Sequence, residues 1–580
     1  MIDWLYDPRV WIASISLLML GALSVYKKSP SVVFGTAVLG YAALGLVDMR
    51  ELLDHFTNTG LVTLILLMLV SIVLEKTVLI DRLAGRLVSA DYSRSLAKLS
   101  SVSLICSAFL NNTVVVATLL NKVANNSYHS PSRLLIPLSY CAILGGTMTL
   151  VGTSTNLILN GFVIEVGLPS LQLFDFTYVG LPVALLCSVG IWLLSWHCLP
   201  DRNIDTARRR DFLVEATVTA TSGLVGCTVE ENGLRKLDSL FLAEIQRGEE
   251  LISPVRPSTL IFAEDRLLFS GEISDVAQIE QLSGLVLNDH GVGVPRTNLI
   301  EAVLSHTSSL VGKTVKNTGF RSHFDAAVLA VCRGSDKLSG RIGDIELKAG
   351  DCLILATGQD FEQRRPGKHM HLIQGKIQIP ALKFKQSFGA MLGFLLSLTG
   401  SALGLIPLMD ALVFLLAAYL ALGWLSPSEI RFRFPLGVFV TVGCALSIAG
   451  VWISSGLIDS FVSIIYPWLN GGSPFIALVI VYLLTVILTE LVTNNVAVAL
   501  SFPLAYASAQ YFEVEPMAFI MASAFGASAS FITPLGYQTN LMVFSAGRYE
   551  FIDFVKLGVP VSLIYGVTVL TFIPIIYPFH

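Results

Sequence analysis

The sequence predicts an α-helical polytopic membrane protein built from two inverted repeats, each with five transmembrane helices and one re-entrant hairpin. A tandem of α+β domains is inserted between the repeats. The 580 residues are 53% hydrophobic and only 14% charged, whereas a typical soluble domain is about 25% charged. The apolar runs form two blocks around a charged, strand-like block. Each apolar block carries one paired-asparagine motif, "LNNTVVVATL" at 110–119 and "VTNNVAVAL" at 492–500.

Each apolar block predicts five membrane spans, because a helix needs about 20 apolar residues to cross the hydrocarbon of a bilayer. The first five spans lie near residues 9–25, 30–47, 61–78, 134–163 and 176–198. The other five lie near residues 384–400, 403–423, 434–453, 513–544 and 556–577. The first run follows acidic residues and lacks a small-residue cleavage site, so we expect a span and not a cleaved signal.

Basic residues predict the orientation of these spans by the positive-inside rule. If the N-terminus is outside, most basic clusters fall in the cytosol: Lys27, Lys28, Arg82, Arg86, Arg94, Lys98, Lys122, Arg133, Arg431 and Arg433. The pattern holds only if the asparagine-bearing stretches, about 99–121 and 475–509, are re-entrant hairpins. The membrane repeats, residues 1–200 and 376–580, are then inverted copies, as in secondary transporters. We expect the cell inner (plasma) membrane, both termini outside, and residues of about 200–375 in the cytosol.

Asparagine and threonine at a hairpin tip favour an ion site. Non-helical backbone at membrane depth is tolerated only where it lines a cavity or is buried in protein. There the amides and free carbonyls can replace the water shell of a small cation. The alternative is that these side chains only hold helices together, but their presence at matching positions of both repeats favours ion binding.

A second pair of motifs follows the hairpins, "GGTMTLVGTSTNLI" at 145–158 and "GASASFITPLGYQTNLM" at 526–542. Both are rich in Gly, Ser and Thr, and both contain Thr-Asn-Leu. Pro534 and Gly536 disfavour a continuous helix. We expect unwound segments that complete two sites; the alternative is a helix with small residues for close packing.

These four motifs resemble those of the divalent anion/sodium symporter (DASS) family, whose superfamily also holds arsenite and Na⁺/H⁺ transporters. The family has Ser-Asn-Thr at each hairpin tip. The matches are Asn111-Asn112-Thr113 and Thr493-Asn494-Asn495, so only the central asparagine is kept in both. The resemblance implies a homodimer that moves a divalent anion with Na⁺, with two sodium sites per protomer, by an elevator or rocking motion.

The resemblance also implies which residues form the sites. The two sodium sites would use Ser107, Asn111, Asn112 and Gly152, and Thr489, Val492 (backbone carbonyl), Asn494 and Gly536. The anion would contact Asn112, Thr113, Thr153, Asn494, Asn495 and Tyr537. Dicarboxylate members typically read like Gly-Ser-Pro-Pro-Asn and Ala-Thr-Pro-Pro-Asn in the unwound segments, whereas this chain reads "GTSTN" and "GYQTN". The loss of both Pro-Pro pairs and the bulky Tyr537 favour a smaller anion such as sulfate.

The residue chemistry agrees with an anion site without a cationic side chain, because the four motifs contain no Arg or Lys. Hydroxyls, amides and helix N-termini can hold the anion while bound Na⁺ supplies positive charge. Glu490 is the single carboxylate in the two hairpins. It is a candidate proton or tuning site, but we favour a structural acid bonded to backbone within its hairpin.

The middle block repeats with a shift of 86 residues: "TSGLVGCTVEENGLR" at 221–235 matches "TSSLVGKTVKNTGFR" at 307–321, and "EDRLLF" at 264–269 matches "GDCLIL" at 350–355. A repeat of this size predicts two small α+β domains, 211–288 and 297–367. They resemble the C-terminal domain of TrkA-type potassium-channel regulators (RCK-C). That resemblance implies cytosolic domains that dimerise or regulate, with a small ligand such as a cyclic dinucleotide.

The leading function is a sodium-coupled symporter that imports a divalent anion, with sulfate favoured. The alternatives are a dicarboxylate/sodium symporter, a Na⁺/H⁺ antiporter or arsenite-type exporter, and a membrane anion sensor. An antiporter would need more acids near the sites, and a sensor needs no alternating access. We expect no enzyme, because no Ser/His/Asp arrangement, metal cluster or phosphate loop is recognised in the cytosolic block. The net charge of −4 is near balance and carries no information on nucleic acid, and we expect no nucleic-acid partner.

Overall fold

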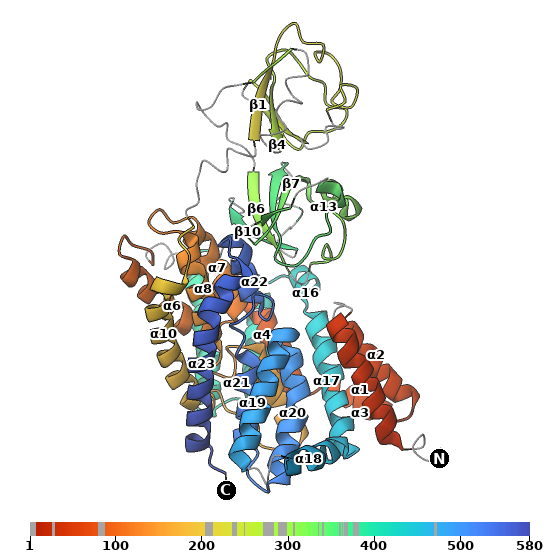
Figure 1. Cartoon of the computed structure of the whole chain (residues 1–580), viewed down its shortest axis with the longest axis vertical. Coiled ribbons are helices and arrows are strands. Elements are labelled where there is room, and N and C mark those ends of the chain that lie inside the picture. Colours follow the sequence, from red (N-terminus) through yellow and green to blue (C-terminus); the bar gives the residue numbers. More distant parts are fainter. Residues whose placement is uncertain are drawn as a thin grey trace.

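The computed structural model describes residues 7–25, 30–78, 87–202, 213–234, 241–248, 250–270, 284–287, 299–305, 308–334, 336–338, 342–358, 361, 364, 369–374, 382–468 and 473–579. Helices form one body, and two β-sheets are stacked at one end of it (Figure 1). Lys27, Lys28, Arg82 and Arg86, used above for orientation, lie outside the described residues.

The helices of the first repeat cover its five predicted spans and its predicted hairpin. They are α1 (Pro8–Val25), α2 (Pro30–Ala43), α3 (Met49–Phe56), α4 (Thr59–Glu75), α6 (Tyr92–Phe109), α7 (Asn112–Ala124), α8 (Pro131–Gly146), α9 (Ser154–Glu165) and α10 (Thr177–Cys198). Helix α3 is an addition to the prediction. It begins where the Asp48 side chain accepts a hydrogen bond from the Arg50 amide, a favourable N-cap.

The second repeat likewise contains helices at all of its predicted spans. They are α14 (Phe384–Ala402), α15 (Leu408–Ala421), α16 (Pro427–Arg433), α17 (Leu436–Ser454), α18 (Leu457–Trp468), α19 (Pro474–Leu491), α20 (Asn494–Tyr511), α21 (Met517–Ser528), α22 (Gln538–Ala546) and α23 (Phe551–Ile576). The short α16 was not predicted, and a capping box between Ser426 and Glu429 starts it. Helix α18 was not predicted either, since it lies where a loop of about 454–474 was expected.

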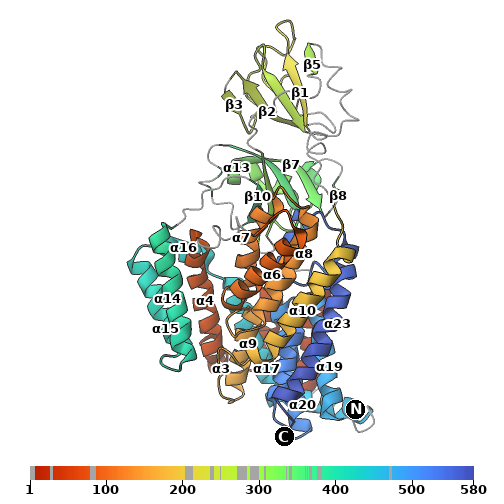
Figure 2. The same ribbon diagram turned by 90° about the vertical axis from the view of Figure 1, so that its left-hand side faces the viewer.

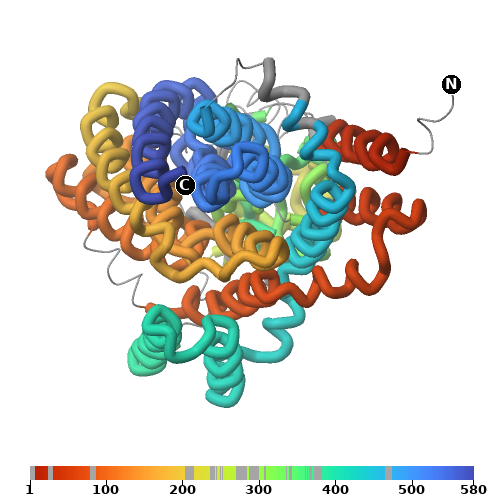
Figure 3. Tube along the Cα trace, turned by 90° about the horizontal axis from the view of Figure 1, so that it is seen from below, coloured from red at the N-terminus to blue at the C-terminus, as the bar shows by residue number. Residues whose placement is uncertain are grey.

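Five helical stretches among the described residues are long and apolar enough to cross a membrane. They are Met49–Glu75, Thr177–Cys198, Leu436–Ser454, Pro474–Leu491 and Phe551–Ile576. Helices of the two repeats interleave, since α17 packs against α2 and α15 packs against α4. Figure 3, seen from below, shows α14 and α15 beside α4, and α1 and α2 beside α17. The two blocks of helices therefore share one apolar core.

Helix breaks fall at all four motifs. The helices α6 and α7 are separated only by Leu110 and Asn111, and α19 and α20 only by Val492 and Thr493. The expected unwound segments are confirmed as non-helical breaks at residues 147–153, before α9, and 529–537, before α22. Helices α6 and α7 lie toward the sheets, whereas α19 and α20 extend toward the opposite end (Figures 1 and 2).

The middle block forms two five-stranded antiparallel sheets. The first has the order β3-β2-β4-β1-β5 and the second β10-β6-β9-β7-β8. Their strands are β1 (Leu213–Val218), β2 (Phe241–Arg247), β3 (Glu250–Ile252), β4 (Arg266–Ser270), β5 (Leu285–Leu287), β6 (Leu299–Leu304), β7 (Ala326–Arg333), β8 (Asp336–Lys337), β9 (Cys352–Thr357) and β10 (Met370–Gln374). If β6 to β10 are matched to β1 to β5 in chain order, both sheets have the same strand order, so the repeat seen in the sequence is also a structural repeat.

An arginine–aspartate pair recurs in both sheets at the same repeat positions. Arg247 binds Asp265 with nitrogen–oxygen distances of 2.9 Å, and Arg333 binds Asp351 at 2.7 and 2.8 Å. The hydrogen bonds that Arg333 donates to Asp351 raise the pKa of the Arg333 guanidinium above its ordinary value. Each pair ties the end of one inner strand to the residue just before the neighbouring strand and so stabilises that end of the sheet.

Candidate ion and anion site

The first hairpin tip holds a buried hydroxyl against a buried amide. The Ser107 hydroxyl is hydrogen-bonded to the Asn112 side-chain amide over 2.5 Å, and both residues are almost fully buried. Asn111 caps α7, because its side-chain oxygen accepts a hydrogen bond from the Thr113 amide at 2.9 Å. This cap fixes the first turn of α7, where its amides are free of partners within the helix.

Oxygen atoms converge on the Asn112 amide. One end of the Asn112 amide points toward Ser107 and lies 3.2 Å from the Gly152 carbonyl oxygen and 3.1 Å from the Ala142 carbonyl oxygen. If this end is the amide nitrogen, it donates a hydrogen bond to each of these carbonyls; if it is the amide oxygen, it faces only other oxygens. A side-chain amide is assigned by such partners, so the satisfied orientation is the one in which the Asn112 nitrogen donates to both carbonyls and its oxygen accepts from the Tyr537 hydroxyl. A Cβ on Gly152 would lie 2.9 Å from the Ser107 carbonyl oxygen, so glycine allows this close approach.

The second hairpin tip has the same geometry. The Thr489 hydroxyl lies 2.8 Å from Asn494 Oδ1 and 2.7 Å from the Ala527 carbonyl oxygen. Thr489 and Asn494 are five residues apart, as are Ser107 and Asn112. Val492 ends α19. A Cβ on Gly536 would meet the Thr489 carbonyl oxygen at 3.3 Å, so Gly536 approaches this tip as Gly152 approaches the first.

Asn494 differs from Asn112 in its hydrogen bonding. Its side chain is only 5% exposed, and its Nδ2 has no hydrogen-bond partner among the residues that the structure describes. A buried amide donor without a partner costs free energy, of the order of 1–3 kcal/mol. The Asn494 amide therefore has an N–H group at the first turn of α20 that can donate a hydrogen bond to an anion.

The N-termini of four helices are joined by side chains across the two repeats. Tyr537, which precedes α22, has its hydroxyl 2.7 Å from Asn112 Nδ2 and 3.4 Å from the Thr153 hydroxyl. At the start of α9, the Ser154 hydroxyl donates to Asn495 Oδ1 over 2.9 Å. Because helix N-termini carry partial positive charge and free amides, this junction of α7, α9, α20 and α22 suits an anion.

The structure thus brings all predicted sodium and anion residues to this junction or to the tips beside it. It adds Ser154 and Gln538, which the sequence analysis missed. The Thr113 hydroxyl donates to Gln538 Oε1 over 3.2 Å. The available signal was their shared position directly before Thr-Asn-Leu in both unwound motifs.

Paired asparagines in the unwound segments hold those segments in shape. Asn156 Nδ2 donates to the Thr149 carbonyl at 2.9 Å, and Asn540 Nδ2 donates to the Ser530 carbonyl at 2.8 Å. Backbone without helical hydrogen bonds needs such partners when buried. The Thr-Asn-Leu repetition thus has a structural cause.

Glu490 has different partners from those expected. It accepts hydrogen bonds from the Ile532 amide at 2.8 Å, the Thr533 amide at 3.1 Å and the Thr533 hydroxyl at 2.7 Å. The expectation of backbone partners within its own hairpin was wrong, since these donors lie in the segment between α21 and α22. Ala108 occupies the matching position of the first repeat, and its carbonyl accepts from the Thr149 hydroxyl.

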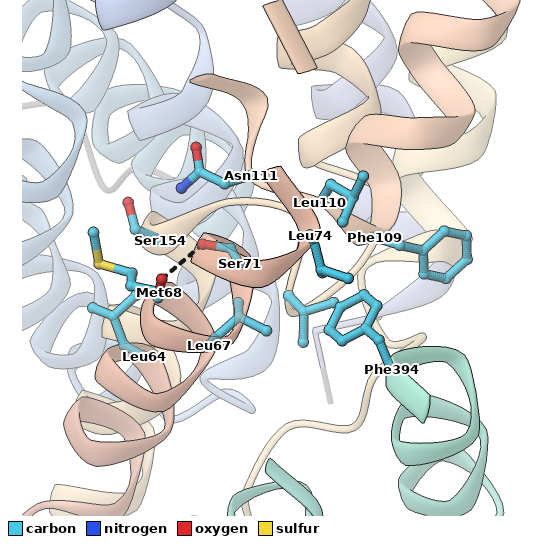
Figure 4. Close-up of a pocket in the computed structure, with 11 residues that line it drawn as sticks. Leu64, Leu67, Met68, Ser71, Leu74, Phe109, Leu110, Asn111, Ser154 and Phe394 are labelled. Atoms are coloured by element: carbon cyan, nitrogen blue, oxygen red, sulfur yellow. Dashed lines mark hydrogen bonds between the residues drawn. The ribbon is translucent and has the colours of Figure 1, made fainter. Parts of the chain in front are cut away.

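A small pocket adjoins the first hairpin tip (Figure 4). Its walls come from α4, the tip, α9 and α14, and they are mainly Leu, Met, Val and Phe side chains, with Ser71, Asn111 and Ser154. An apolar lining does not suit a small charged ion. The pocket therefore is not one of the ion sites.

Comparison with known proteins places the chain among transporters. The family model described as "Citrate transporter" matches residues 15–524 and 406–579. The chain is 31% identical to a putative sulfur deprivation response regulator of Chlamydomonas reinhardtii, over 90% of this chain and 93% of the relative. It is 29% identical to an uncharacterized transporter of Synechocystis sp., over 92% and 91%.

A third relative, sodium/sulfate cotransporter 2 of Chlamydomonas reinhardtii, is 29% identical over 62% of this chain and 43% of the relative. These matches cover both blocks of helices, and five described helical stretches suit a membrane. This multi-pass membrane protein therefore belongs to the citrate transporter family.

Proposed function

We propose that this protein is a sodium-coupled symporter that imports a small divalent anion, sulfate, by alternating access. The observation that carries the proposal is the junction of four helix N-termini around Asn112, Ser154, Asn494 and Tyr537. The motifs at this junction offer hydroxyl and amide donors but no Arg or Lys. A cation bound beside the junction would supply the missing positive charge.

The two sodium sites of the proposal are the oxygen clusters behind the hairpin tips. Ser107, Asn111, Asn112 and Gly152 form the first site, and Thr489, Val492, Asn494 and Gly536 form the second. The Ser107 hydroxyl, the Asn112 side chain and the Gly152 carbonyl, which lie together at the first tip, support the first site. Because each site shares its asparagine with the anion site, bound Na⁺ would orient the amide and raise anion affinity, which is thermodynamic coupling.

Sulfate as the substrate is supported by Tyr537 and by a relative. The Tyr537 hydroxyl reaches Asn112 and Thr153, so this bulky side chain takes up space that an extended carboxylate would need more than a tetrahedral oxyanion. Asn112, Thr113, Thr153, Asn494, Asn495 and Tyr537 would contact the anion, together with Ser154 and Gln538. The relative named sodium/sulfate cotransporter 2 supports both the ion and the anion.

A carboxylate is the second candidate substrate, because the matching family is described as citrate transporters. The same four helix N-termini would bind either anion. Tyr537 distinguishes the candidates, since a smaller residue there would enlarge the site for a carboxylate.

In the proposed topology both termini lie outside the cell inner (plasma) membrane and the sheets lie in the cytosol. The stretches of about 99–121 and 475–509 are re-entrant hairpins in two inverted repeats, 1–200 and 376–580. Residues 211–288 and 297–367 form TrkA-C-like domains that regulate the transporter or hold a homodimer together, with a small ligand or cyclic dinucleotide as effector. The matching strand order of the two sheets supports the tandem.

Uptake of labelled sulfate into proteoliposomes tests the function, with an inward Na⁺ gradient against a K⁺ gradient. We expect Na⁺-dependent uptake that is lost in Asn112→Ala and Asn494→Ala and kept in Asn125→Ala, an exposed asparagine at the far end of α7. Citrate, succinate and arsenite serve as competitors. Na⁺-dependent uptake of a carboxylate alone would overturn sulfate, and no Na⁺-dependent uptake of any anion would overturn the symporter.

A further inference from the structure

The second sheet, β6 to β10, packs directly on two helices of the proposed anion site. Strand β10 packs against α7, and β6 packs against α22. Val303 of β6 and Cys352 of β9 belong to the same buried apolar cluster as the helices. Figure 1 shows β6 and β10 at the ends of α7 and α22. The second sheet is therefore continuous with the helical core and not merely tethered to it.

Two glycine turns of this sheet make the contact with α22 and the chain just after it. Gly334 and Gly350 have φ of +62° and +82°. A Cβ on Gly334 would lie 2.7 Å from the Phe544 ring and 2.8 Å from the Tyr549 carbonyl oxygen, and one on Gly350 would lie 2.6 Å from the Leu541 side chain. The Ser545 hydroxyl also donates to the Gly350 carbonyl. The interface has no room for a methyl group at either turn.

The ion pair between Arg333 and Asp351 makes these two turns one rigid unit. Arg333 directly precedes Gly334, and Asp351 directly follows Gly350. Asp351 is fully buried. Asp351 also accepts a hydrogen bond from the Lys348 amide at 2.8 Å. The bidentate geometry of an arginine–carboxylate pair restricts relative movement of the two turns.

The first sheet provides an internal comparison, because it has turns at the same two repeat positions. Gly248 occupies the position of Gly334 and has φ of +57°, and no described residue lies within 4 Å of its Cβ position. Glu264 occupies the position of Gly350 and still adopts φ of +66°. The turn geometry thus tolerates a side chain, and the tight fit at Gly350 arises from packing on α22.

Helices α7 and α22 connect this surface to the anion site. They pack along each other, and their N-terminal residues are joined by Asn112 to Tyr537 and by Thr113 to Gln538. The α22 helix has 9 residues, so Ser545 lies about 12 Å along it from Tyr537 at 1.5 Å per residue. A short helix packed on both sides transmits displacement from one end to the other.

We propose that the second sheet controls the anion site by setting the relative position of α7 and α22. The effect on anion affinity rests on the proposed function. The coupling of the second sheet to the positions of α7 and α22 does not. Displacement of the second sheet, whether by an effector or by a second copy of the chain, would change the spacing of Asn112 and Tyr537. Anion affinity would change without any change to a residue of the site.

The test compares Gly334→Ala with Gly248→Ala in the full-length protein. Both changes place a methyl group at a positive φ of similar size, but only the first meets the helices. Two quantities are measured: hydrogen exchange of the first two turns of α7 and α22 without substrate, and the KM for sulfate in proteoliposomes. We expect Gly334→Ala to speed hydrogen exchange at the two helix starts and to raise the KM for sulfate about fivefold or more. We expect Gly248→Ala to change neither the exchange nor the KM.

Two results would overturn the inference. One is faster exchange confined to the second sheet in Gly334→Ala, with unchanged exchange at the two helix starts. The other is an equal effect of both variants on the helix starts, since only one position touches them. If the wild-type protein shows no Na⁺-dependent uptake, the proposed function fails, while the exchange comparison still decides the mechanical coupling.

A second variant covers the case in which Gly334→Ala does not fold. Ser545→Ala removes only the hydrogen bond to the Gly350 carbonyl and leaves the space unchanged. We expect faster exchange at the start of α22 in this variant as well, and unchanged exchange there would contradict the coupling.

Discussion

The chemistry of the proposed site depends on a few polar side chains in an apolar core. The Tyr537 hydroxyl meets both Asn112 and Thr153, so it stabilises the junction and narrows it. Tyr537→Phe keeps the ring and removes one hydrogen-bonding group, worth about 1 kcal/mol or about fivefold in affinity. We expect a KM for sulfate raised by that factor, while Tyr128→Phe, which changes an exposed tyrosine, leaves it unchanged. An unaltered KM in Tyr537→Phe would remove this tyrosine from the anion site.

A negative charge at position 494 should weaken sulfate binding by electrostatic repulsion. Asn494→Asp replaces a buried donor without a described partner by a carboxylate beside the proposed anion. We expect weaker sulfate binding by at least about tenfold, because a like charge in a desolvated site costs more than 1.4 kcal/mol. Equilibrium binding of labelled sulfate measures this loss of affinity, and the control Asn125→Asp should bind sulfate as tightly as the wild type. Binding as tight as in the wild type would place the anion away from α20.

Among the structural elements, the unwound segment before α22 depends most on one residue. Glu490 accepts three hydrogen bonds from Ile532 and Thr533, which hold the segment that carries Gly536. Glu490→Gln replaces one acceptor oxygen by a donor, so a buried amide loses its partner at a cost of about 1–3 kcal/mol. We expect a thermal unfolding midpoint lowered by several degrees, and no change in Glu515→Gln, an exposed control. A thermal unfolding midpoint of Glu490→Gln equal to that of the wild type would mean that the unwound segment keeps its shape without the Glu490 carboxylate.

The helices were largely predictable from the sequence, because long apolar runs define membrane helices by length alone. Helices such as α3 and α16 were missed because they are short and carry charges. The positions of the asparagine tips were predictable from the repeated motifs. The partners of Glu490 were not, since they come from a segment 42 and 43 residues further along the chain. The contact of Gly350 with α22 was likewise hidden, because a glycine in a turn does not indicate what packs against it.

For the whole molecule, the testable feature is its orientation. Figure 1 shows the sheets at one end of the helical body, and Figure 2 shows the turn between α14 and α15 on the side of these helices away from the sheets. We expect Ala402→Cys, which changes the exposed last residue of α14 beside that turn, to react with an impermeant maleimide in intact cells. Asn317→Cys, at an exposed position between β6 and β7, should react only after permeabilisation. The opposite pattern would reverse the proposed topology, and the wild-type chain controls for native cysteines.

The coupling of sodium to anion binding is the central claim, since the proposed anion site lacks a cationic side chain and shares Asn112 and Asn494 with the sodium sites. Equilibrium binding of labelled sulfate to the purified protein, titrated with Na⁺ at constant ionic strength, tests it most directly. We expect that sulfate binding requires Na⁺, rises with Na⁺ concentration more steeply than a one-site curve, and is lost in both Asn112→Ala and Asn494→Ala. Sulfate binding that is equally tight in K⁺ alone would contradict it.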